Sequence, residues 1–179
     1  MAEKKKPYTL AGDEKATPAM VYTLNSLAWG DVITKEAVRV STYLRTIAPD
    51  YVSLYDAHAL LLGGEHGRPL AFPELHIRTA QVLAFHLLPP ASEPLDYDPA
   101  ELNRKMEPVT VLVGPFRFDA LLRISTLTTL AKHVEITTDV FISLYDATMS
   151  CPIAPSLGVV RMPLVLIRRD VAQFATRPG

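Results

Sequence analysis

The chain of 179 residues carries 18 basic and 19 acidic side chains, and 49 % of its residues are hydrophobic. This balance gives no bulk attraction to nucleic acid or to an anionic membrane, while the hydrophobic content is normal for a globular core. With one cysteine, Cys151, no intramolecular disulfide can form. No apolar run reaches the roughly 20 residues of a membrane-spanning helix. The basic start lacks the apolar stretch of a signal peptide, so we expect a cytoplasmic protein.

The first part of the chain predicts a flexible tail and then a unit rich in strands. Residues 1–17 are polar and without periodicity, which is typical of a tail. Residues 18–88 form the first predicted unit, in which Gly30-Asp31 indicates a turn and Ser41 occupies the N-cap position of one short helical turn. Its strands are predicted at 21–29, 32–40 and 51–62, with a hairpin over 75–88.

The second part repeats this pattern after a linker. Residues 89–108 combine several prolines with an acidic cluster, which predicts a semi-extended linker because proline blocks both helix interiors and strand ladders. Ser125 is the expected N-cap of a longer helical piece, and residues 176–179 are a predicted tail. The second unit, residues 109–175, has predicted strands at 109–113, 116–124, 140–147, 159–167 and 171–175.

A repeated string organises the chain. Residues 53–57, Ser-Leu-Tyr-Asp-Ala, recur at 143–147, and the flanking strands align at a spacing of 90 residues. Residues 39–42, Arg-Val-Ser-Thr, align instead with 123–126, Arg-Ile-Ser-Thr, at a spacing of 84, which predicts six inserted residues in the second copy. We therefore predict a mainly β protein with two tandem small barrel-like or sandwich-like units, related by internal duplication and each with one short helix.

The motifs of each copy resemble a family of uncharacterised bacterial small β-domains. Arg-x-Ser followed by a helical turn, and then an apolar strand ending in Leu-x-Asp-Ala, is similar to that family's R-x-S-D-L-L-N and F-L-x-L-x-D-A. Thr42 and Thr126 stand where the pattern has aspartate, and its asparagine is missing. The resemblance implies a small barrel somewhat like Sm or PRC-barrel folds, and it implies no activity.

The repeated acids, Asp56 and Asp146, are the first candidates for chemistry. Two carboxylates in related positions could serve acid–base catalysis or a metal. The favoured interpretation is structural, because active sites seldom need to occur twice. In that interpretation each aspartate ends its strand and accepts hydrogen bonds from the next turn.

The arginines are the second group. Four of them repeat, and we favour pairing with the aspartate of their own unit over phosphate binding; they are Arg39, Arg123, Arg78 and Arg168. Arg161, Arg168 and Arg169, with Lys132, could instead form a basic patch. Ordinary surface charge is the favoured interpretation of that set.

The remaining candidates give weaker signals. The histidines have no zinc-ligand spacing, although His58, His76 and His86 could converge in space, and no cofactor motif occurs. Cys151 is expected to be a plain buried or loop cysteine, and the glycine-rich residues 63–67 a hairpin loop. Trp29, beside the predicted turn, could be an exposed contact residue or part of the core.

Duplication without a catalytic set favours a non-catalytic structural or adaptor protein that works through protein contacts or self-association. The first alternative is a module that binds a ligand or nucleic acid through the arginines of the second unit. The second is an enzyme with its site between the units, using Asp56 or Asp146 with a histidine.

Overall fold

The computed structural model describes residues 6–46, 49–63 and 68–177. The chain divides into two compact units, Met1–Ser92 and Glu93–Gly179. Both are built mainly from antiparallel strands, as the sequence predicts. The predicted loop at 63–67 lies almost wholly outside the described residues. In the part of the chain that is described, no helix is long and apolar enough to cross a membrane.

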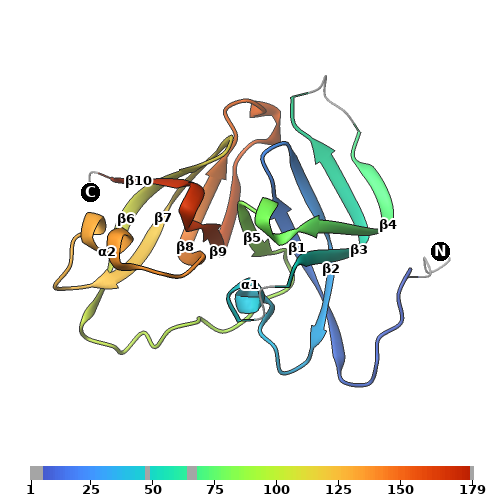
Figure 1. Ribbon diagram of the computed structural model, residues 1–179, viewed down its shortest axis with the longest axis horizontal. Coiled ribbons are helices and arrows are strands. Elements are labelled where there is room, and N and C mark those ends of the chain that lie inside the picture. The colour runs from blue at the N-terminus through green and yellow to red at the C-terminus, as the bar shows by residue number, and fades with distance from the viewer. Residues whose placement is uncertain (1–5, 47–48, 64–67, 178–179) are drawn as a thin grey trace. The chain divides into compact units, whose positions relative to one another are not determined.

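The first unit is an antiparallel sheet with the strand order β5-β1-β2-β3-β4 (Figure 1). Apolar side chains alternate along its long strands, so one face of the sheet carries the core. Short helical turns, η1 (Val40–Thr42), α1 (Tyr43–Thr46) and η2 (Thr79–Gln81), connect the strands. The strands are β1 (Glu14–Tyr22), β2 (Ser26–Lys35), β3 (Tyr51–Leu61), β4 (Leu70–Arg78) and β5 (Ala84–Leu87).

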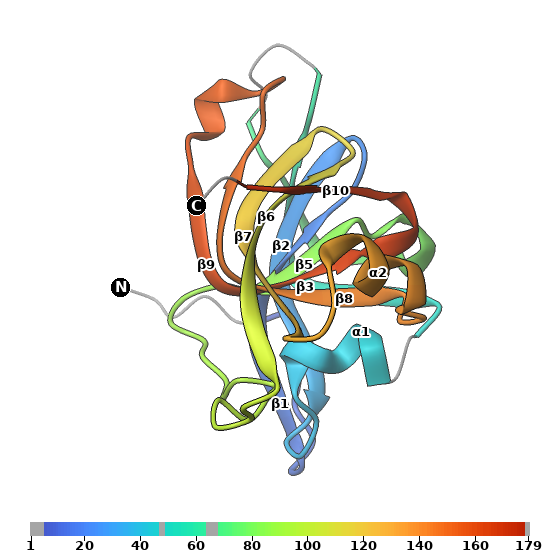
Figure 2. The same ribbon diagram turned by 90° about the vertical axis from the view of Figure 1, so that its left-hand side faces the viewer.

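The second unit has the strand order β10-β6-β7-β8-β9, and its last strand β10 pairs with its first strand β6 (Figure 2). Helix α2 (Leu130–Ile136) begins after Thr129, whose side chain accepts a hydrogen bond from the Lys132 backbone N–H. Two 3-10 turns are η3 (Pro155–Leu157) and η4 (Arg169–Val171). The strands are β6 (Arg104–Val113), β7 (Phe116–Ser125), β8 (Phe141–Ser150), β9 (Val160–Arg168) and β10 (Ala172–Thr176).

Both sheets are open, which corrects the prediction of barrels. In the first unit β5 and β4 stand at opposite ends of the strand order, and in the second unit β10 and β9 do. Closure would require these terminal strands to pair with each other. The strand pattern predicted the mainly β class, but closure depends on sheet curvature, which that pattern does not encode.

Several predicted boundaries are also wrong. Strand β1 begins at Glu14 and β6 at Arg104, so the predicted tail and linker both extend too far. The first turn lies at Leu24-Asn25, where the Thr23 N–H bonds the Ser26 carbonyl at 2.9 Å, and Gly30 lies inside β2. Polar residues and prolines near the start of a strand have the composition of a tail, but cross-strand pairing overrides local propensity.

Most corresponding elements of the two units begin 90 residues apart, whereas β5 and β10 begin 88 residues apart. Strand β2 starts at Ser26 and β7 at Phe116, while β3 starts at Tyr51 and β8 at Phe141, so each step is 90 residues. The same 90 residues separate β4 from β9 and Val40 of η1 from Leu130 of α2. The predicted six-residue insertion is therefore wrong.

The Arg-x-Ser-Thr strings do not occupy equivalent positions. Arg39 precedes η1 and Ser41 is buried inside it, whereas Arg123 and Ser125 lie in β7. Neither serine is a helix N-cap, because Arg39 and Thr129 take those positions. The pairing of strands decides equivalence between the units, and a four-letter match between different elements has no structural meaning.

Candidate functional site

Asp56 and Asp146 lie inside their strands and adopt left-handed backbone conformations, with φ of 46° and 47°. The register of β2 with β3 shifts between Trp29 and Asp31, so Asp56 and Ala57 together face Gly30. An aspartate tolerates this conformation better than most residues, and an extra residue of this kind is a β-bulge. The prediction that each aspartate ends its strand is wrong, because both lie at a bulge within the strand.

The bulge changes which side chains face the core. Val52 and Leu54 are buried before it, whereas Ala57 and Ala59 are buried after it. Ser53 and Tyr55 consequently point to the face of the sheet away from the core. Ser143 and Tyr145 have the corresponding positions in β8, where the register shifts in the same way between Asp119 and Leu121.

In the second unit this serine and tyrosine hold a carboxylate. Ser143 Oγ donates to Asp96 Oδ2 at 2.7 Å and Tyr145 Oη donates to Asp96 Oδ1 at 2.6 Å. The ring of Tyr97 packs edge-on against Tyr145, with a centroid distance of 4.9 Å. Residues 93–103, which we term the acidic strap, are thus bound to the outer face of the second sheet and are not a free linker.

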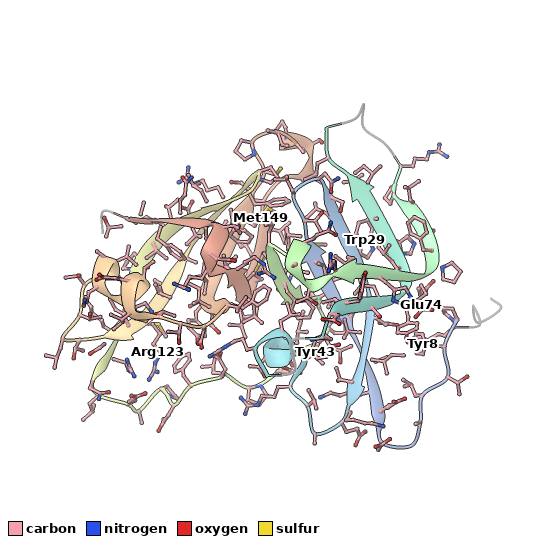
Figure 3. The ribbon with its side chains drawn as sticks, in the orientation of Figure 1. Tyr8, Trp29, Tyr43, Glu74, Arg123 and Met149 are labelled. Atoms are coloured by element: carbon pink, nitrogen blue, oxygen red, sulfur yellow. The ribbon has the colours of Figure 1, made fainter. Side chains whose placement is uncertain are left out.

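Arg123 fixes the other end of the acidic strap (Figure 3). Its guanidinium bonds Glu101 Oε2 at 2.6 Å and the Asp98 carbonyl at 3.1 Å, and it lies 4.5 Å from the Tyr97 ring centre. The guanidinium groups of Arg123 and Arg104 lower the pKa of the Glu101 carboxyl. The predicted partner of Arg123 was Asp146, so that pairing is wrong.

Removing the Asp96 carboxylate should destabilise the second unit. In Asp96→Ala the hydroxyls of Ser143 and Tyr145, of which Tyr145 is only 6 % exposed, lose their acceptor. We expect a loss of about 1–3 kcal/mol in the free energy of unfolding. Urea denaturation measures this, and Asp98→Ala is the control because its side chain accepts only an exposed bond from the Ala100 N–H. Equal effects of the two variants would contradict the assignment.

The first unit places different groups around its serine and tyrosine. Tyr8 packs edge-on against Tyr55 at 5.6 Å, and its hydroxyl donates to Asp31 at 2.6 Å. Burial and a hydrogen bond with Glu74 raise the pKa of Tyr55. Glu74 and Tyr8 lie on the same side of the first unit in Figure 3. Lys6 also bonds Asp31, so the segment before β1 is held against the sheet.

Four side chains form what we term the polar row: Ser53, Tyr55, Glu74 and His76. Ser53 on β3 lies directly opposite His76 on β4, and Tyr55 lies opposite Glu74. Ser53 Oγ is 2.9 Å from His76 Nδ1, and His76 Nε2 is 3.4 Å from Glu74 Oε1. A serine, histidine and carboxylate in sequence are the components of an activated hydroxyl nucleophile. The second unit has leucines at the positions 90 residues later, Leu164 and Leu166.

The polar row adjoins an exposed sheet edge. Among the described strands β4 pairs with β3 alone and ends the strand order of its unit. The Thr79 N–H bonds the Asp50 carbonyl at 2.9 Å, and backbone groups alternate in direction along a strand. Ile77 and Leu75 therefore direct their backbone groups towards β3. The backbone groups of Glu74, His76 and Arg78 point away from the sheet.

The arginines of the second unit are not gathered into one patch. Arg161 pairs with Thr148 and Arg168 with Phe141, at opposite ends of β9. Arg168 is only 9 % exposed, lies over the Phe141 ring and is 3.8 Å from Asp170. Arg169 donates to the Asp139 carbonyl at 3.1 Å.

One shallow depression brings two of the predicted residues together. Asp146 and Arg161 both line it, together with Thr148 and Met162. A carboxylate and a guanidinium on an open surface provide opposite charges but no enclosure for a ligand. Arg39 does not line this depression and immediately precedes η1.

The histidines and the cysteine have separate environments. His58 stacks on Trp29 within the sheet at 5.6 Å, so Trp29 is not beside a turn. His86 is buried, its Nδ1 donates to the Leu87 carbonyl and its Nε2 accepts from Tyr22 Oη, and burial lowers its pKa. Cys151 is buried. No group of three metal-ligating side chains occurs among the residues described.

No family model matches the chain, and no curated protein or solved structure matches it either. The resemblance to small bacterial β-domains therefore stays a prediction. The residues that sequence reasoning missed are Asp96, Tyr97 and Glu74, and His76 was considered only beside the other histidines and not beside Ser53. Their only signal was the recurrence of serine and tyrosine two residues apart in both strings, which marks one face of a strand.

Proposed function

We propose that the protein is a non-catalytic adaptor or structural subunit that takes up an extended segment of another polypeptide on β4. The observation that supports this most directly is the exposed edge, with the backbone groups of Glu74, His76 and Arg78 directed outwards. Strand addition to such an edge satisfies these groups and gives affinity through main-chain hydrogen bonds.

The composition of β4 supports the same proposal. Most of its residues are exposed, and they include the apolar side chains Leu70 and Phe72, at 48 % and 36 % exposure. By contrast, β9 is largely buried towards its end. An edge that carries unpaired backbone groups and apolar side chains has the two features that an added strand uses.

We also propose that the two units arose by internal duplication. The 90-residue spacing of most elements and the shared strand order within each unit support an origin from one repeated unit. The duplicated serine and tyrosine then diverged. In the second unit they bind the acidic strap, and in the first they border the β4 edge.

The test is a proline placed in the edge. In His76→Pro the outward N–H is lost while the hydrogen bonds of β4 to β3 remain, so the fold should persist. We expect the wild type to associate with itself or with a protein identified by mass spectrometry, and His76→Pro to lose that association. Light scattering and affinity capture measure this, with His76→Ala as the control that keeps the N–H. A monomeric wild type that captures nothing sensitive to the proline would refute the proposal.

A second candidate function, hydrolysis through Ser53, is favoured by the distances in the polar row. In such a step Ser53 Oγ would attack the carbonyl carbon of an ester, and its proton would pass to His76 Nδ1. The Nε2–H group of His76 would keep its contact with the Glu74 carboxylate. The bond to the alcohol would then break, and the alcohol would take the proton from Nδ1. A water molecule would then attack the acyl carbon and give a proton to His76 Nδ1. The bond to Ser53 Oγ would break, and Ser53 would take that proton back.

A fluorophosphonate probe separates this candidate from the first. It should label Ser53 and lose that label in His76→Ala, whereas Ser143, which faces Asp96, is the matched control and should stay unlabelled. No labelling of Ser53 above the level of Ser143 would eliminate hydrolysis and leave the adaptor function in place.

A further inference from the structure

The outer edge of β4 shows a charge pattern that is complementary to itself. After Pro73 its outward residues are Glu74, His76 and Arg78, so an acid and a base stand at equal distances on either side of a histidine. We propose that the occupant of this edge is β4 of a second copy of the chain, paired antiparallel about a two-fold axis at His76. This inference rests on the proposed function and names its partner.

The register follows from the direction of the backbone groups. Two outward residues face each other in a pair that exchanges two hydrogen bonds. With His76 opposite His76 of the partner subunit, the outward residues Glu74, His76 and Arg78 of each strand are all paired. Three such pairs give about six hydrogen bonds across the axis. Within residues 74–78, any shift by two residues leaves at least one outward residue of each strand without a residue opposite it.

Charge selects the same register. With His76 at the axis, Glu74 lies opposite Arg78 of the partner subunit, and the pair occurs twice. A register centred on Glu74 would place two carboxylates directly opposite each other, which is unfavourable. A register centred on Leu75 would leave both Arg78 side chains without an acid opposite them.

The core side of the strand adds apolar contact. Leu75 is half-buried at the sheet edge, and in the His76 register it would lie opposite Ile77 of the partner subunit. Pro73 is outside the paired residues 74–78, so its missing N–H does not interrupt the added ladder. Proline often protects an edge strand from pairing, and here it leaves this half of β4 open.

A charge swap in the full-length chain tests the register. Glu74→Arg places two arginines opposite each other, and Arg78→Glu places two glutamates, so each should weaken association at least about tenfold. The double variant Glu74→Arg/Arg78→Glu restores opposite charges and should return the dimer to within about threefold of wild type. The control is Glu36→Arg, which makes the same charge change at an exposed site after β2. Sedimentation equilibrium measures the dimer dissociation constants of all four variants, and circular dichroism checks that each variant is folded.

Cross-linking identifies the axis independently. In a Cys151→Ser background, His76→Cys should give a covalent dimer with a short bismaleimide, and Leu75→Cys should give much less. Efficient cross-linking through residue 75 would overturn the register. The register would also be overturned if the double variant associated as weakly as the single variants. Association that responds to Glu74→Arg no more than to Glu36→Arg would place the contact elsewhere.

The outcomes also separate this inference from the proposed function. A wild type that is monomeric at all concentrations, yet captures an identified protein in a manner sensitive to His76→Pro, would overturn the second copy as the occupant and keep the adaptor function. A wild type that neither associates with itself nor captures another protein would refute both the inference and the proposed function.

Discussion

Gly30→Val is expected to destabilise the first unit by about 3 kcal/mol. Gly30 faces the Asp56 bulge, and a Cβ atom at this position would lie 2.8 Å from the Tyr55 carbonyl oxygen and 3.1 Å from Ala57 Cα. Both contacts are to backbone, which can move only if the β2–β3 pairing moves with it. The additional methyl groups of valine increase the displacement. Urea denaturation of the purified variant measures the loss.

Gly12→Val is the matched control for this variant. No atom lies within 4 Å of a Cβ added at Gly12, so we expect a change within about 0.5 kcal/mol. Similar losses for both variants would mean that the effect comes from replacing any glycine. A stable Gly30→Val protein would mean that the bulge does not require close approach of β2. In the second unit Ala120 occupies the corresponding position, so the tolerance for a Cβ differs between the two bulges.

Leu54→Ala should cost about 2–5 kcal/mol in the free energy of unfolding of the first unit. Leu54 is fully buried in the middle of β3, between the repeated serine and tyrosine. Removing its branched end leaves a cavity that neighbouring strands cannot fill without losing their register. Thermal and urea unfolding followed by circular dichroism measure the effect.

Leu61→Ala serves as the control because Leu61 ends the same strand and is 58 % exposed. We expect a change within about 0.5 kcal/mol for it. Leu144→Ala, at the matching buried position of β8, should give a loss of similar size in the second unit. If Leu54→Ala and Leu61→Ala were equally stable, the repeated string would not be the core of its unit.

The strands that carry the repeated string illustrate what patterning can predict. The alternation of Val52 and Leu54 with Ser53 and Tyr55 predicted a long strand with one buried face, and the structure confirms it. The same pattern could not predict the bulge, because nothing in the sequence around Asp56 marks a break in the alternation of side chains. The left-handed conformation of Asp56 appears only when β2 pairs with β3.

The polar row shows a similar division. The sequence contained Ser53 and His76, but 22 residues lie between them and no spacing rule connects them. The β3–β4 hairpin register brings Ser53 opposite His76 and Tyr55 opposite Glu74. The acidic strap is a comparable case, since Asp96 reaches Ser143 and Tyr145 only when it lies across the second sheet.

The sequence by itself determined the mainly β class, the two-unit organisation of its strands and the buried face of the strand that carries each string. These depend on local alternation and turn residues, which are properties of short segments. Tertiary structure alone decided the bulges at Asp56 and Asp146 and the partners of each repeated serine and tyrosine. These depend on which strands pair and in what register, and one residue of register moves every side chain to the other face.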